Sequence, residues 1–124
     1  MNKRFTWRSR LASFRYAFAG FRVLFRSEPN ALLHLLAAIA VVVAGFWTGL
    51  SRTEWALVIL SVVLVFGMEL INTAVEQLCD HVEPSRHPDI KRIKDLSAAA
   101  VLAVAIGAAA VGAMVFLPKW LSLL

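Results

Sequence analysis

Cysteine is almost absent from this sequence, which contains a single thiol, Cys79, in 124 residues. One thiol cannot form a disulfide within the chain, and no second cysteine stands at the spacing of a metal site. The cysteine content therefore excludes a disulfide-stapled scaffold and leaves the redox compartment open.

Proline and acidic residues are also scarce, with four prolines and eight Asp or Glu against thirteen Lys or Arg. The formal charge of +5 suits an anionic partner such as lipid headgroups, phosphate or nucleic acid. Apolar residues are in excess, because 60% of the chain is hydrophobic, against about 45–50% in soluble domains. This composition predicts a single integral-membrane domain over residues 1–124.

Three apolar runs are long enough to cross a bilayer, which takes about 20 residues per helix. The predicted transmembrane helices cover residues 31–50, 55–79 and 96–117. Trp47, Trp55 and Trp120 lie near the ends of these runs, where tryptophan anchors a helix at the membrane interface. The sequence thus predicts an all-α membrane protein with three transmembrane helices.

Residues 1–29 follow a different pattern, in which apolar side chains recur at intervals of three and four between arginines. The apolar positions are Leu11, Phe14, Phe18, Phe21 and Phe25. A basic amphipathic helix of this kind lies along the headgroup boundary with its apolar stripe in the lipid. The alternative, a helix packed on a soluble core, fits poorly because the rest of the chain is membrane-like.

Basic residues are distributed unevenly around the predicted spans. Seven precede the first span and four lie in the 80–95 loop, but only Arg52 and Lys119 flank the opposite side. By the positive-inside rule the N-terminus and this loop are cytoplasmic in a multi-pass membrane protein. Because the basic residues adjoin membrane ends and no nucleic-acid-binding signature occurs, nucleic acid is not an expected partner.

The second span carries polar side chains before it ends, in the stretch GMELINTAVEQLCD. Glu69, Asn72, Glu76 and Asp80 are spaced by three, four and four residues, so they share one helix face over about 16 Å. Ionisable groups inside a span are costly and usually mark ion pathways, proton relays or catalytic sites. The alternative is a set of structural hydrogen bonds, which would not require repeated carboxylates.

The segment before the third span, HPDIKRIKD, is suited to phosphate binding. Pro88 is a favourable first helical residue, so Lys91, Lys94 and Asp95 should lie in the first turns of a helix. Lysines there are candidates to hold nucleotide phosphates, with His87 beside them. No GxxxxGK loop occurs, which excludes a P-loop kinase.

Two carboxylates are candidate ligands for Mg²⁺, which binds one or two protein carboxylates together with phosphate oxygens and water. One is Glu76, and the other is Glu28, the only acid before the first span. Taken alone, Glu28 would be read as an exposed surface charge or a helix-end residue.

These stretches resemble the small integral-membrane lipid kinases of the prokaryotic diacylglycerol kinase and undecaprenol kinase family. The resemblance is carried by SFRYAFAGFRVLFRSEPN, GLSRTEW, ELINTAVEQLCD and HPDIKRIKDLSAAAVL, and it covers nearly the whole chain. It implies phosphorylation of the hydroxyl of a membrane lipid alcohol in the bacterial cytoplasmic (inner) membrane, with ATP as donor and Mg²⁺ as cofactor. It also implies a homotrimeric bundle of four-helix chains whose active sites are shared between neighbouring subunits.

The resemblance also implies roles for single residues. Glu69 matches the catalytic base, which meets the lipid hydroxyl, and Asn72 and Asp80 match supporting polar positions. Glu28 and Glu76 match the metal-binding carboxylates. The positions around ATP are Arg10, Tyr16, Glu28, Glu76, Arg86, His87, Lys94 and Asp95. Ser9 stands where the diacylglycerol branch has an arginine, so either Arg8 or Arg10 takes that role.

Undecaprenol is the expected lipid substrate, with His34 and Trp47 as further lipid-binding residues. The position of His34 carries an acid in the familiar diacylglycerol form, and the HPDIK and GLSRTEW stretches are more similar to undecaprenol kinases. A polyprenol presents one hydroxyl on an apolar chain and needs fewer polar partners than diacylglycerol. A diacylglycerol kinase that makes phosphatidic acid is the alternative, and His34 is alternatively an interfacial histidine with no substrate role.

Other classes of protein also place a carboxylate such as Glu69 inside a helix bundle. A small ion- or proton-coupled transporter is one alternative, although it would not explain the acids and Lys94 gathering at one side of the membrane. Small-residue pairs in the third span, such as Ala103 with Gly107, allow close helix packing either within one chain or between chains.

Overall fold

The computed structural model describes residues 4–124, and this part of the chain is almost entirely helical. Its helices are α1 (Trp7–Ser27), α2 (Pro29–Thr48), α3 (Arg52–Val82) and α4 (Pro88–Leu121). Three of them, α2, α3 and α4, are long and apolar enough to cross a membrane. The prediction of an all-α protein with three such helices is confirmed.

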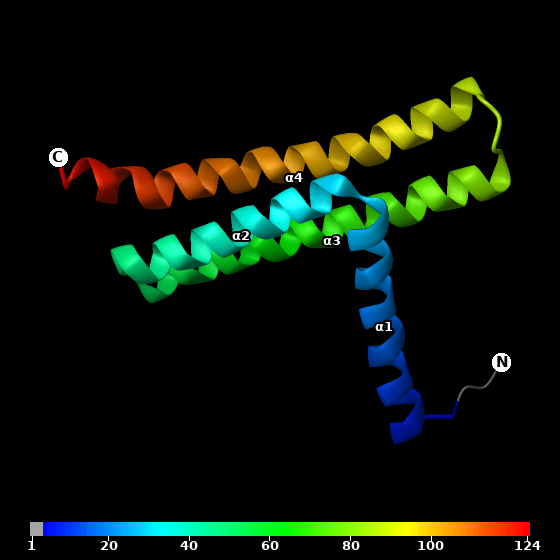
Figure 1. Ribbon diagram of the computed structural model, residues 1–124, viewed down its shortest axis with the longest axis horizontal. Coiled ribbons are helices and arrows are strands. Elements are labelled where there is room, and N and C mark those ends of the chain that lie inside the picture. Colours follow the sequence, from blue (N-terminus) through cyan, green and yellow to red (C-terminus); the bar gives the residue numbers. More distant parts are fainter. Residues whose placement is uncertain (1–3) are drawn as a thin grey trace.

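Helices α2, α3 and α4 lie alongside one another, and α1 leaves them at a steep angle (Figure 1). The corner between α1 and α2 is Glu28, which has extended backbone angles of φ −120° and ψ 105°. Pro29 explains the break, because a proline disfavours helical angles in the residue before it and is well suited to open the next helix. The corner lies beside the middle of α3, and the α3–α4 hairpin extends beyond it (Figure 1).

Local capping sets the helix ends, so the helices differ in length from the apolar runs. Helix α2 stops at Thr48 because Gly49 adopts a left-handed φ of 74°, a conformation that glycine reaches without strain. Helix α3 begins with a capping box, in which the Ser51 hydroxyl accepts from the Glu54 amide and the Glu54 carboxylate accepts from the Ser51 amide.

Helix α4 begins at Pro88, as the sequence predicts, and is therefore longer than the apolar run at 96–117. The Nδ1 atom of His87 accepts a hydrogen bond from the Asp89 amide at 3.1 Å and caps this helix. The first two turns of α4 consequently carry the basic segment of the hairpin as ordered helix.

The buried core lies at the end of the bundle away from the α3–α4 hairpin. Val58 of α3 packs there with Val115 and Phe116 of α4. Helix α2 approaches α3 closely at Gly45, where an added Cβ would lie 2.6 Å from the ring of Trp55. These contacts fix how the three long helices sit relative to one another.

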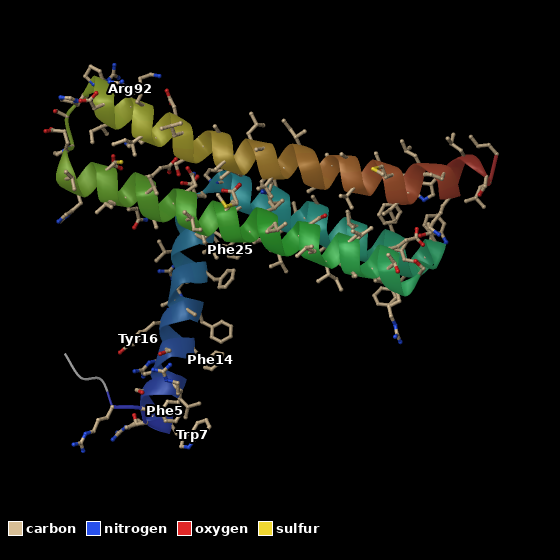
Figure 2. The ribbon with its side chains drawn as sticks, turned by 180° about the vertical axis from the view of Figure 1, so that it is seen from behind. Phe5, Trp7, Phe14, Tyr16, Phe25 and Arg92 are labelled. Atoms are coloured by element: carbon tan, nitrogen blue, oxygen red, sulfur yellow. The ribbon has the colours of Figure 1, made fainter. Side chains whose placement is uncertain are left out.

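Side chains of α1 project to two sides. Phe14 and Phe25 point to the side along which the body of the bundle extends, whereas Tyr16 points to the side of the α3–α4 hairpin (Figure 2). Phe25 contacts Phe66 of α3, with ring centroids 6.1 Å apart, and Leu24 is fully buried. The C-terminal end of α1 is thus fixed to the bundle.

Candidate active site

The polar face of α3 is the most unusual feature of the bundle. Glu69, Asn72 and Thr73 are among its buried side chains, although most of the surface of the long helices is exposed. Burying a carboxylate without partners is costly, so its surroundings must compensate. The neighbours of this face come from the α1–α2 corner and from α2.

Glu28 lies against Glu76, although the two residues are 48 positions apart in the sequence. A hydrogen bond with the Glu76 carboxyl raises the pKa of Glu28 to about 7, and burial and the negative charges of Glu76 and Glu69 act in the same direction. The two carboxyls therefore compete for one proton. A divalent cation would relieve the same repulsion, because carboxylate oxygens are preferred ligands of Mg²⁺.

The pair supplies only part of a metal coordination sphere. Within residues 4–124, no group of three His, Cys, Asp or Glu side chains is arranged to hold a metal ion. Mg²⁺ commonly uses one or two protein carboxylates and completes its shell with phosphate oxygens and water. Glu28 and Glu76 fit that use of the ion.

Asn72 supports this pair from one turn away on α3. Its Nδ2 atom donates to Oε1 of Glu76 at 3.3 Å, and its Oδ1 atom is buried without a partner in the described part of the chain. The amide thus orients Glu76 and keeps one buried acceptor free for a further donor.

Glu69 lies deeper along α3 and contacts His34 of α2. The Nδ1 atom of His34 is 3.1 Å from Oε1 of Glu69, with the side chains 28% and 5% exposed, respectively. The same Nδ1 atom has no aligned hydrogen bond within residues 4–124, so the contact is close in distance but not linear. The contact becomes an ion pair when the imidazole is protonated.

A second group of predicted residues surrounds the α3–α4 hairpin. Arg86, His87, Lys94, Asp95 and Asp80 line a cavity of about 590 Å³ at this end. Nζ of Lys94 lies 2.5 Å from Oδ1 of Asp80 and joins α4 to α3. Asp80 lies about one helical turn beyond Glu76 on α3, so this cavity, which both acidic and basic side chains line, adjoins the acidic pair from the hairpin side.

An apolar cavity of about 280 Å³ lies between α2, α3 and α4. Ala38, Val62 and Ala108 are among its lining residues, and His34 is its one ionisable lining residue within the described chain. His34 therefore joins this cavity to the Glu69 carboxylate.

Three predicted site residues lie apart from these groups in the single chain. Tyr16 is 66% exposed on α1, and the Arg10 guanidinium stacks over the ring of Phe5 near the far end of that helix. Trp47 is 88% exposed and lies about 20 Å from His34 along α2. The chain by itself does not bring Arg10, Tyr16 or Trp47 to the acidic cluster.

Comparison with known proteins matches residues 15–116 to the family described as prokaryotic diacylglycerol kinase. This chain belongs to that family. The matched range runs from the middle of α1 almost to the end of α4, and it includes every predicted site residue except Arg10.

Curated members of the prokaryotic diacylglycerol kinase family carry two names. Undecaprenol kinase of Bacillus subtilis is 38% identical over 107 residues, which cover 86% of this chain and 87% of that protein. Diacylglycerol kinase of a Synechocystis species is 40% identical over 115 residues, covering 92% of this chain and 66% of that protein. Diacylglycerol kinase of Escherichia coli K12 is 31% identical over 87 residues, covering 70% and 71%.

The contact between His34 and Glu69 is the feature of this family member that sequence reasoning missed. His34 was expected to meet lipid, and Glu69 was expected to act as a base, but no periodicity connects them. The contact depends on the rotation of α2 against α3, which is set by packing such as that of Gly45 on Trp55. A sequence pattern within one helix carries no signal for it.

Proposed function

We propose that this chain transfers the γ-phosphoryl group of ATP to the hydroxyl of a membrane lipid alcohol. The observation that carries this function is the acidic cluster of Glu28, Glu69 and Glu76, next to a hairpin cavity whose lining includes Lys94, on which the charge of Glu76 acts. Membership of the prokaryotic diacylglycerol kinase family supports a lipid kinase with ATP as the phosphoryl donor.

Glu69 is the general base in this proposal. It takes the proton of the lipid hydroxyl as the lipid oxygen bonds to the γ-phosphorus and the bond to the β-phosphate oxygen breaks, releasing ADP. A carboxylate enclosed in the bundle is suited to this step because water does not compete for it. Glu69 is also the acid that lies deepest along α3, where a lipid headgroup can reach.

Glu28 and Glu76 would hold Mg²⁺, which when bound neutralises charge on the nucleotide phosphates. Asn72 keeps Glu76 in place through its amide hydrogen bond. Asp80 holds Lys94 at the edge of the hairpin cavity, where its ammonium group can meet phosphate oxygens. Arg86, His87 and Asp95 line the same cavity and complete the proposed nucleotide site.

Undecaprenol is the proposed substrate, with diacylglycerol as a slower one. The cavity that meets His34 is lined mainly by alanine and valine, which suits an apolar chain bearing a single hydroxyl. The relative named undecaprenol kinase matches most of both chains, which supports this choice.

A surface position of α1 and a cytoplasmic N-terminus fit the same picture. Phe14 and Phe25 point along the body of the bundle and Tyr16 points to the hairpin side, as expected for a helix on the cytoplasmic face of the inner membrane (Figure 2). The apolar side chains would then enter lipid, and Tyr16 would face the nucleotide.

A homotrimer with shared sites would account for residues that stand alone in one chain. Arg10 and Tyr16 are far from the acidic cluster, so a neighbouring α1 could supply them to it. Gly107 has no side chain or distant backbone within 4 Å of an added Cβ, which leaves this part of α4 open to a neighbouring helix.

Transport across the membrane has less support. The sequence has no ionisable residue between Glu54 and Glu69 in α3, between His34 and Thr48 in α2, or between Asp95 and Lys119 in α4. An ion crossing the bundle would therefore lack a polar path through the half of the membrane beyond Glu69.

The proposed function is tested with purified protein in lipid nanodiscs, radiolabelled ATP and Mg²⁺. Undecaprenol and diacylglycerol are supplied in turn, and label in the extracted lipid is measured. We expect label in both lipids with a higher kcat/KM for undecaprenol. No label in any lipid alcohol would contradict the kinase function, whereas an advantage for diacylglycerol would contradict only the substrate preference.

A further inference from the structure

We propose that His34 is a positioning residue for Glu69, holding the carboxylate oriented so that it can take the proton of the lipid hydroxyl. This inference rests on the proposed kinase function and adds to it a role for an α2 side chain. Its basis is the 3.1 Å contact between Nδ1 of His34 and Oε1 of Glu69.

The carboxylate of Glu69 is enclosed in the bundle, where it needs a partner to hold it in place. The side chain is only 5% exposed, and its negative charge acts on Glu28. A buried carboxylate without a partner group is costly and has no fixed orientation from solvent. A side chain that contacts Glu69 is therefore needed to keep the carboxylate directed at the lipid hydroxyl.

His34 is the one basic side chain in the described chain that forms an ion-pair contact with Glu69. The charged or titratable neighbours of Glu69 are His34 on α2, Glu28 at the α1–α2 corner and Glu76 on α3 itself. On α4, the lysine nearest this end, Lys94, is held by Asp80. Among residues 4–124, no other basic side chain forms an ion pair with Glu28, Glu69 or Glu76.

The imidazole of His34 lies between Glu69 and the apolar cavity proposed to take the lipid chain. Its Nδ1 atom is fully enclosed against Glu69, although the side chain as a whole remains 28% exposed. The exposed part is therefore the rest of the ring, and His34 also lines the apolar cavity between α2, α3 and α4. An interfacial histidine with no role would not need its enclosed nitrogen on a buried carboxylate.

The test compares His34→Gln with the wild type across a pH series. Glutamine is polar and of similar length but cannot carry a positive charge. An opposite charge at this range changes the proton affinity of a carboxyl by about one to three pH units. We expect the acid limb of kcat against pH to move at least about one unit to higher pH, which lowers kcat about tenfold on that limb and leaves it recovered at alkaline pH.

A second variant, His34→Ala, tests the same role by chemical rescue. Imidazole added to this variant should restore part of kcat, while KM for ATP stays at its wild-type value throughout. The matched control is His81→Gln, which replaces an exposed histidine of the same helix bundle outside the site, and its pH profile should equal that of the wild type.

The results separate this inference from the function on which it rests. A His34→Gln enzyme with the wild-type pH profile would overturn the positioning role and leave the kinase intact. A pH-independent loss without imidazole rescue would also overturn it, since that outcome indicates only a packing defect. Absence of lipid phosphorylation by the wild type would instead contradict the proposed function.

Discussion

Replacing Glu76 by glutamine should lower the pKa of Glu28 from about 7 toward its ordinary value of 4.5. The change removes the carboxyl that shares a proton with Glu28 and places an amide donor beside it, which favours the ionised form. At pH 7 about half of the wild-type Glu28 side chains carry a proton, whereas a carboxyl with the ordinary pKa is about 99% ionised.

Carboxyl ¹³C NMR titration of glutamate-labelled protein in nanodiscs without Mg²⁺ measures this change. The resonance of Glu28 is identified by its loss in Glu28→Gln. Saturating Mg²⁺ should lower the wild-type pKa as the variant does, because the metal replaces the shared proton. A Glu28 resonance that titrates near 4.5 in the wild type, or near 7 in both proteins, would refute the shared-proton pair.

The pair of Glu28 and Glu76 also makes the free energy of unfolding fall as pH rises. The pKa of Glu28 is higher in the folded chain, at about 7, than the ordinary 4.5 expected after unfolding. The folded state therefore binds more protons between these values, so the free energy of unfolding is greatest below pH 4.5 and falls as pH rises to about 7. Glu76→Gln should flatten this slope in metal-free denaturant titrations.

Other positions give separate tests. Gly45→Ala should lower the free energy of unfolding by about 1–2 kcal/mol in a detergent titration, because the added Cβ would overlap the ring of Trp55. The higher helix propensity of alanine offsets only part of that cost. Gly20→Ala, where the added Cβ meets open space, should be neutral or stabilising in the same titration. Lys94→Met should raise KM for ATP about 10- to 100-fold in steady-state assays, since a charged phosphate contact is lost; an unchanged KM would exclude that contact. In a Cys79→Ala background, Ser85→Cys should react with an impermeant thiol reagent only from the cytoplasmic side, and labelling only from outside would reverse the topology.

The sequence predicted features that depend on one helix at a time. The spacing of Glu69, Asn72 and Glu76 placed them on one face because a helix repeats every 3.6 residues, and Pro88 marked the start of α4 because proline suits that position. The pairing of distant residues, by contrast, was open. Glu28 was a candidate partner of Glu76 as the only acid before the first span, and the family resemblance supported the pair, but no spacing predicts a contact across 48 residues.

The exact ends of the helices and the contacts between them could not be predicted from the sequence. The capping box at Ser51 lengthens α3 beyond its apolar run, and capping depends on backbone angles as well as residue type. The approach of His34 to Glu69 depends on how α2 is rotated against α3. The roles of Arg10 and Tyr16 remain predictions, because one chain leaves them far from the acids.

The most direct measurement of the central claim is transfer of labelled phosphoryl from ATP to undecaprenol by the wild type and by Glu69→Gln in the same nanodiscs, with ATP binding measured in parallel. Glutamine keeps the shape of the side chain but cannot accept a proton. The account predicts that the wild type labels the lipid and that Glu69→Gln loses at least about 100-fold in kcat while binding ATP with wild-type affinity. Wild-type turnover by Glu69→Gln would contradict the assignment of the buried carboxylate as the catalytic base.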